Sequence, residues 1–567
     1  MKTILKSALS CLLLCLSITL AAQRNKNVES SLLDAVTFYD SGNYAEAEKL
    51  LKPLAAAAPD NDAVMYYLAL CTSAQGDIET ASAYMSEAVR LDPSNFSYKD
   101  RLARMYAASS QFEAAIAIYE SLIKDFPTKT DLYYTLAQLY ARENKGEEVL
   151  STLDEIEAVS GKDEVVTLAK YDVLMRMQRN EDAYKVLESY NDQYSSSQIL
   201  SAMGDYNLNQ FNDTLAYKCY SEALSYESDN GQALVGLSEV YRLRRDYPNY
   251  FATINGFLSS ASLPLESKTH YIQTLLQHVD PQFIKSFKAN LDLLVETYRE
   301  QAPSDSVVLQ TAGSYFYNTG RSDKAGELLY SCCNLYPGSL SSRAMYVQVL
   351  AGDEKWEALF DAAEQAYRDF PDEIAFLQMK TSAEYSLERY DELVKDCGRI
   401  IAAAPHDTSA VLSSLSAIGD VYHMMNEPAK AWAAYEKALK MDPAYLPVLN
   451  NYAYYLSLMG KKMKKAYAMS KITVEAEPDN ATYLDTFGWI LYLQGKAVEA
   501  KPFFKHAMLY GGKDSVTVLD HYAEVLYALG EYDLAKVYWN LAKNKNADGT
   551  VPDLDERVQK RLDAISK

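Results

Sequence analysis

The residue types most often used for catalysis and metal binding are scattered along this sequence. It contains seven cysteines and six histidines, and no HExxH motif or Cys/His cluster has ligand spacing. Five cysteines lie beyond the N-terminal segment, an odd number without paired spacing, which does not form a disulfide framework. They are Cys71, Cys219, Cys332, Cys333 and Cys397. The sequence therefore predicts no metal, no cofactor and cysteines that serve as small core residues.

Motifs for covalent or phosphoryl chemistry are also missing from the sequence. It has no Gly-rich phosphate loop, no GxSxG elbow and no Cys/His nucleophile pairing. The 77 acidic residues leave one enzymatic alternative, because helical toroids can hold two acids across a pocket for glycoside hydrolysis. Such toroids are built from helical hairpins longer than the 34-residue repeat that spaces the prolines of this sequence. We therefore predict that the protein is not an enzyme.

Length and charge narrow the classes of fold and partner. A chain of 567 residues exceeds one globular core, so either several domains or one elongated solenoid is expected. The formal net charge is -22, and so acidic a surface repels phosphate backbones. Nucleic acid is therefore not an expected partner.

The N-terminus has the pattern of a secretory signal peptide over residues 1–22. Lys2 and Lys6 precede an apolar run from Ala8 to Leu20, and small residues follow before Gln23. An uncleaved anchor is one alternative. Lipidation at Cys15 is another, although Leu14 stands where a small residue would be needed. Cleavage near Ala22 is expected, and the mature chain has no further apolar segment long enough to span a bilayer.

Small residues recur with spacings of 12 and then 7 residues inside apolar helical patterns. Three such sets lie towards the C-terminus. They are Gly419, Ala431 and Ala438; Gly488, Ala500 and Ala507; and Ala523, Ala535 and Ala542. Helix-ending prolines recur every 34 residues in two series, namely Pro59, Pro93 and Pro127, and then Pro303, Pro337, Pro371 and Pro405. Small residues at these places let two antiparallel helices approach closely.

This pattern resembles the tetratricopeptide repeat, a helix-turn-helix unit of 34 residues. The resemblance implies an all-α, right-handed superhelical solenoid of about fifteen repeats, whose first helices line a concave groove for a protein or peptide partner. The expected parts are an N-terminal array over 28–262, a degenerate repeat with a change of curvature over 263–303, a C-terminal array over 304–546 and a capping helix over 550–567.

In this family the groove positions lie three before and one or four after the small residue of each first helix. Near the C-terminus these positions carry acidic, aromatic and small polar side chains. They are Ser416, Asp420, His423, Asn450, Tyr454, Ser457, Asp485, Trp489, Tyr492, Asp520, Glu524 and Tyr527. Because no Lys or Arg is among them, the resemblance favours a positively charged partner. The alternative is that these residues only link neighbouring first helices.

The resemblance extends to exported proteins of the Bacteroidetes, through the signal followed by Gln23 and the 46 tyrosines. It implies a non-catalytic scaffold in the periplasm or at the outer membrane of a Gram-negative bacterium, peripherally attached to an envelope complex. A carbohydrate- or peptidoglycan-binding module that uses the same aromatic groove is the alternative function.

Overall fold

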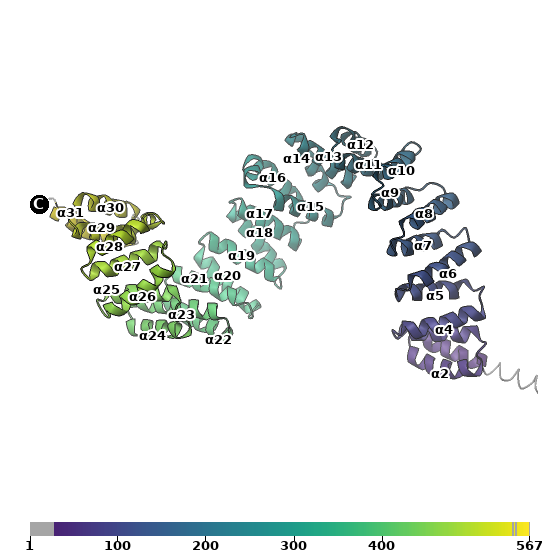
Figure 1. Cartoon of the computed structure of the whole chain (residues 1–567), viewed down its shortest axis with the longest axis horizontal. Helices are drawn as coiled ribbons and strands as arrows, with labels where there is room; N and C mark the ends of the chain where they lie inside the picture. Colours follow the sequence, from purple (N-terminus) through teal and green to yellow (C-terminus); the bar gives the residue numbers. More distant parts are fainter. Residues whose placement is uncertain (1–27, 547–548, 550, 552, 566–567) are drawn as a thin grey trace, which may run out of the picture. The chain divides into compact units, whose positions relative to one another are not determined.

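The computed structural model describes residues 28–546, 549, 551 and 553–565, and the described part of the chain is helical throughout, without a strand (Figure 1). The predicted all-α array of helical hairpins is therefore confirmed. The predicted signal peptide lies outside the described residues. The chain divides into two compact units, one up to Pro264 and one from Leu265.

The first unit begins with a helix over 28–40. Its further helices are α2 (Tyr44–Ala57), α3 (Asp62–Ala74), α4 (Ile78–Leu91), α5 (Phe96–Ala108), α6 (Phe112–Asp125), α7 (Thr130–Arg142), α8 (Gly146–Ser160), α9 (Glu164–Arg176), α10 (Asn180–Asn191), α11 (Ser197–Asn209), α12 (Asp213–Tyr226), α13 (Gly231–Leu243) and α14 (Tyr247–Ser259).

The second unit continues the same alternation of helices. They are α15 (Leu265–His278), α16 (Pro281–Gln301), α17 (Ser306–Asn318), α18 (Ser322–Leu335), α19 (Leu340–Gly352), α20 (Trp356–Asp369), α21 (Ile374–Ser386), α22 (Tyr390–Ala403), α23 (Thr408–Met424), α24 (Pro428–Met441), α25 (Leu446–Leu458), α26 (Met463–Ala476), α27 (Ala481–Leu493), α28 (Ala497–Ala507), η1 (Gly512–Asp514), α29 (Val516–Ala528), α30 (Tyr532–Lys545) and α31 (Leu554–Ile565).

The small residues of the repeat lie where the two helices of a hairpin meet. Ala69 on α3 and Ala81 and Ala88 on α4 are completely buried. A Cβ at Gly419 of α23 would lie 2.2 Å from the Tyr435 ring of α24. Only glycine lets that ring fill the gap, so the small residue and the aromatic side chain form one packing unit.

Polar side chains cap the N-termini of many of the helices, and left-handed residues turn the chain within hairpins. Asn61 accepts a hydrogen bond from the backbone N–H of Val64 at 3.1 Å, and Asp77 accepts one from Thr80 at 3.0 Å. Gly76 joins α3 to α4 with φ of +93°, a conformation that costs glycine little. Short connections of this kind make consecutive helices antiparallel.

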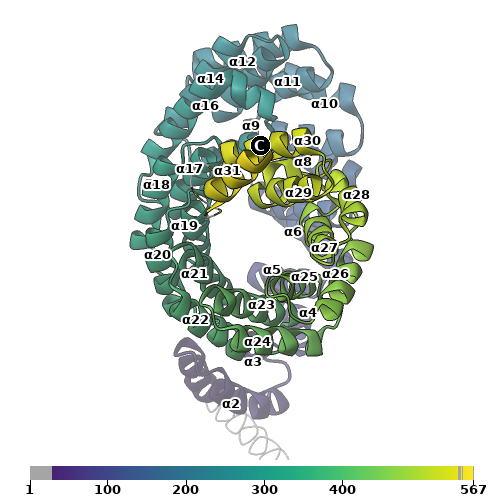
Figure 2. The same ribbon diagram turned by 90° about the vertical axis from the view of Figure 1, so that its left-hand side faces the viewer.

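First helices of neighbouring hairpins also pack on one another, as α23, α25, α27 and α29 do in sequence. In the second unit, Figure 2 shows the odd-numbered helices α19 to α29 on the inner side and the even-numbered α18 to α28 on the outer side. A first-helix face is therefore continuous across hairpins within this unit.

The segment predicted to be a degenerate repeat contains an irregular hairpin. Pro281, which could be expected from the sequence to interrupt a helix, is the first residue of α16, and this helix kinks at Phe287, where φ is -122° and ψ is 26°. The predicted change of curvature over 263–303 stays a prediction.

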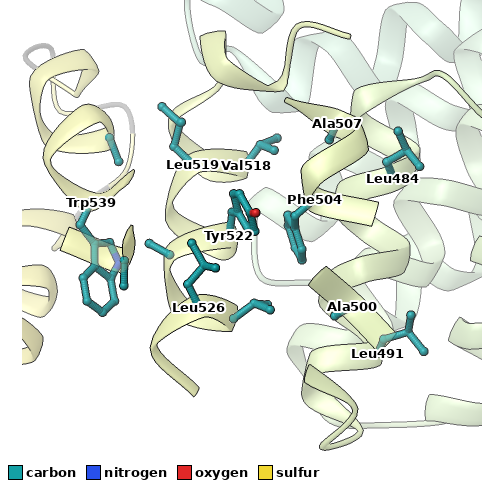
Figure 3. Close-up of a cluster of buried hydrophobic side chains, with 14 of the residues drawn as sticks. Leu484, Leu491, Ala500, Phe504, Ala507, Val518, Leu519, Tyr522, Leu526 and Trp539 are labelled. Atoms are coloured by element: carbon teal, nitrogen blue, oxygen red, sulfur yellow. The ribbon is translucent and has the colours of Figure 1, made fainter. Parts of the chain in front are cut away.

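The C-terminal hairpins enclose a buried cluster that includes Phe504, Tyr522 and Trp539 (Figure 3). Leu554 and Val558 of α31 complete this cluster, so α31 covers the apolar side of the last hairpin. Within the described residues, no helix combines the length and the apolar character needed to cross a membrane.

Candidate functional site

The predicted groove residues lie on four consecutive first helices, α23, α25, α27 and α29, which pack side by side. The register expected from the repeat therefore does bring these side chains onto adjacent helices. What each side chain contacts decides whether it is available to a partner.

The acids of α29 are already paired with cations. Arg557 of α31 donates hydrogen bonds of 3.0 and 2.6 Å to the carboxylate of Asp520. Arg561 donates to Glu524 at 3.4 and 3.1 Å. No Lys or Arg lies among the predicted groove positions, but these two arginines, which come from the terminal helix outside the repeat register, neutralise both acids. The expectation of a basic partner here stays a prediction, but part of its motivation is lost.

Asp520 also holds the core of the last hairpin. It is 4% exposed and accepts a hydrogen bond of 3.1 Å from Nε1 of the buried Trp539. One carboxylate therefore joins α29, α30 and α31. Losing its partners would leave a buried charge without compensation.

On α27, Asp485 contacts a histidine that the repeat register did not identify. Nδ1 of His521 lies 2.9 and 3.2 Å from the two Asp485 oxygens. The ring of His521 stacks on Trp489 with centroids 3.8 Å apart, and Tyr454 lies beside it at 6.2 Å. His521 follows Asp520 by one residue, off the predicted face, so no spacing rule could have found it.

The acid of α23 is held by neutral donors. Asp420 accepts hydrogen bonds from Tyr435 Oη and from Asn451 Nδ2, the latter at 3.0 and 3.2 Å. Burial raises the pKa of Asp420, and these hydrogen bonds oppose the rise. His423 stacks on Tyr455 with centroids 3.6 Å apart, and burial lowers the pKa of His423.

The remaining predicted residues also have packing roles. Asn450 is 3% exposed, and its Oδ1 is buried without a hydrogen-bond partner among the described residues, while Nδ2 donates to Asn451 at 3.2 Å. Burial raises the pKa of Tyr454 to about 12. Tyr492 packs on Trp489 at 5.0 Å, and Arg561 lies 4.9 Å above the Tyr527 ring. Their role in binding stays a prediction.

A buried charged cluster between α20, α21 and α22 was not identified in the sequence. Lys380 donates to Glu364 at 2.8 Å and to Asp396 at 2.7 Å. Glu384 is fully buried, lies 3.4 Å from Lys380 Nζ, and neither of its oxygens has a hydrogen-bond partner among the described residues. Burial first, and then Asp396, raise the pKa of Glu384 to about 8. The only sequence signal is the i,i+4 spacing of Lys380 and Glu384.

The five cysteines are buried and unpaired in the described part of the chain. Burial raises the pKa of the Cys71 thiol to about 11 and that of Cys397 to about 12, which disfavours the reactive thiolate. Three or more His, Cys, Asp or Glu side chains arranged to hold a metal ion do not occur among the described residues.

Comparison with known proteins identifies the repeat in both units. Family models described as tetratricopeptide repeat match residues 38–105 and 106–171, and another matches 412–445. The chain therefore contains tetratricopeptide repeats, and the predicted resemblance is confirmed at these residues. No match to the chain is found among curated proteins.

Two solved structures are similar to nearly the whole chain at low identity. One, described as Naa15/Naa10 bound to HypK-THB, is 14% identical over 95% of this chain and 91% of that chain, with a TM-score of 0.38. The yeast protein Tom70 is 12% identical over 82% of this chain and 95% of its own, with a TM-score of 0.35.

Proposed function

We propose that this protein is a non-catalytic, exported scaffold that holds a protein partner on the face formed by its first helices. The observation that carries the proposal is the continuous packing of first helices from one hairpin to the next in a chain that contains tetratricopeptide repeats. Such a face presents side chains from several helices to one extended partner.

The cellular setting is part of the same proposal. The basic, apolar and small-residue pattern before Gln23 supports export, and the resemblance of the signal region and the tyrosine-rich repeats to exported Bacteroidetes repeat proteins is the ground for proposing a periplasmic or outer-membrane envelope complex. Secreted material should begin close to Gln23. Recovery of Met1 on exported protein would contradict cleavage.

The test is crosslinking of a C-terminally tagged full-length chain in its own cells, followed by purification and mass spectrometry of what is attached. An untagged strain serves as the control. One protein recovered repeatedly above that control, and bound again by the purified chain, is the expected result. Recovery of glycan without protein would contradict the scaffold and favour the carbohydrate-binding alternative.

A further inference from the structure

A cavity of about 520 Å³ opens in the second unit where α15, α16, α17 and α19 meet. Its polar lining includes Gln277, Ser314 and Asn318, and its apolar lining includes Leu276, Ile284 and Met345. Its size falls within the range of sites that enclose a small ligand or a peptide segment. None of the groove residues predicted from the sequence is part of it.

The irregular hairpin α15–α16 supplies one wall of this cavity. Asp280 caps α16 by accepting a hydrogen bond of 2.8 Å from the Phe283 N–H, and the helix kinks four residues later at Phe287. Val279 in the connection and Ile284 in the turn before the kink both line the cavity. The departure from regular repeat geometry, which shows in the sequence as Pro281, thus coincides with a hollow on the first-helix face.

Hydrogen bonds between the helices hold the polar wall in place. Gln273 Nε2 donates to Thr311 at 3.1 Å, Gln310 Nε2 donates to Ser342 at 2.9 Å, and Tyr315 Oη donates to Asp292 at 2.8 Å. The side chains of Gln277, Ser314 and Asn318 have no hydrogen-bond partner among the described residues. A rigid wall therefore carries two carboxamides and a hydroxyl that can bond a ligand.

The lining contains no charged side chain, in a protein whose net charge is -22. A carboxylate in the cavity would find no cation and an ammonium group no carboxylate, so either would lose hydration without compensation. The part of the ligand that enters the cavity must therefore be uncharged. Leu276, Ile284 and Met345 fit an aliphatic group, and the thioether of Met345 can adapt to its shape.

A peptide fits this lining better than a glycan does. Sugars usually pack on an open aromatic face, whereas Tyr315 is only 5% exposed and its hydroxyl is bonded to Asp292. Carboxamide and hydroxyl side chains can both donate to and accept from the amides of an extended backbone.

We propose that this cavity binds an extended, uncharged peptide segment of a protein partner, with one aliphatic side chain inserted beside Leu276, Ile284 and Met345. Gln277, Ser314 and Asn318 bond the main chain on either side of that residue. The inference rests on the proposed scaffold function and deepens it by giving the chemistry of the bound segment.

The test is a selection of random dodecapeptides, displayed on phage, against the full-length protein and against Ser314→Trp, which fills the cavity. Peptides enriched on the wild type and lost on Ser314→Trp should share an aliphatic residue within an uncharged stretch. Basic peptides enriched equally on both proteins, or no enrichment at all, would overturn the proposal.

Synthetic versions of one enriched peptide then give the affinities. Changing its central aliphatic residue to Glu should weaken binding more than about tenfold, because the charge is buried unpaired. Asn318→Ala should weaken binding about fivefold through one lost hydrogen bond, and this exposed position does not endanger folding. The matched control Asn544→Ala, at an exposed position of α30, should change nothing.

Failure of this site is distinguishable from failure of the scaffold function. A crosslinked partner protein that binds Ser314→Trp and Asn318→Ala as tightly as the wild type would overturn the cavity proposal and leave the scaffold standing. If Ser314→Trp shows no cooperative thermal unfolding by circular dichroism, that variant is not folded. The affinity of Asn318→Ala for the partner then decides alone whether the cavity binds it.

Discussion

Two polar regions of the second unit differ in what their side chains already bond. Asp520 and Glu524 on α29 are tied to Arg557 and Arg561, and Asp485 on α27 is tied to His521. In the cavity of α15, α17 and α19, by contrast, Gln277 and Asn318 stay without partners among the described residues. The carboxylates of the charged region are paired within the fold, although Trp489 Nε1 beside them is buried without a hydrogen-bond partner among the described residues, whereas the amides of the neutral region have no partners there.

The difference shows that a cluster of charged residues in a sequence first indicates that the fold must pair these charges with opposite charges. It indicates a ligand only after that pairing is accounted for. Buried carboxylates must be paired within the fold, so their partners are part of the structure. Neutral amides at exposed positions such as Gln277 and Asn318 can be solvated by water and exchanged for a ligand at little cost. Binding capacity therefore follows unpaired groups rather than charge density.

The cluster of α20, α21 and α22 offers the sharpest test of how this fold compensates a buried acid. Glu384 interacts with Lys380 on its own helix and with Asp396 and Cys397 on α22. Glu364 on α20 pairs with Lys380, and Arg399 on α22 pairs with Asp396. Its pKa is raised from 4.5 to about 8, so the folded state keeps a proton that the unfolded state loses above pH 4.5. Stability from this group is fully present below pH 4.5 and is lost as pH rises towards 8.

We expect Glu384→Gln to remove this pH dependence, because the amide resembles the protonated acid. The free energy of unfolding of the variant should exceed that of the wild type by on the order of 3 kcal/mol at the alkaline end and match it at the acidic end. Urea titrations across this pH range measure the difference. If the free energy of unfolding of the two proteins changed with pH in the same way, Glu384 would not be neutral in the folded protein.

The pairing of Asp520 with Arg557 near the C-terminus predicts the next largest effect. Arg557→Ala leaves Asp520 buried without its cation and should lower the free energy of unfolding by about 2 kcal/mol, since the arginine is itself partly exposed. Lys560→Ala on the same helix removes an exposed pair with Glu556 and should leave the free energy of unfolding nearly unchanged, because solvent screens such a pair. If the two variants lowered the melting temperature equally, the burial of the acid would not determine how much its ion pair contributes to stability.

A smaller effect is expected from the acid of α27. Asp485→Asn keeps an acceptor for His521 but removes the charge, and should lower stability by about 1 kcal/mol. Asp479→Asn is the matched control, because it weakens an exposed bond of 2.8 Å to His506. If Asp485→Asn leaves the melting temperature unchanged but weakens a partner, the binding role expected from the sequence would be restored.

Much of the fold follows from the sequence, because the repeat is a packing rule. Gly419 is one of the small residues predicted to lie where two helices approach closely, and the Tyr435 ring packs against it. The partners of the predicted site do not follow from it. Arg557 and Arg561 come from a helix outside the repeat, and His521 is one residue off the expected face. The cavity lies beside the hairpin that kinks at Phe287, and in the sequence Pro281 indicates only that this hairpin is irregular.

Hydrogen–deuterium exchange of the full-length protein, with and without a selected dodecapeptide, tests the central claim most directly. We predict slower exchange in α15, α17 and α19 on binding, with α27, α29 and α31 unchanged, and no protection in Ser314→Trp. Protection confined to α27, α29 and α31 would contradict the account and return the binding site to the acidic face.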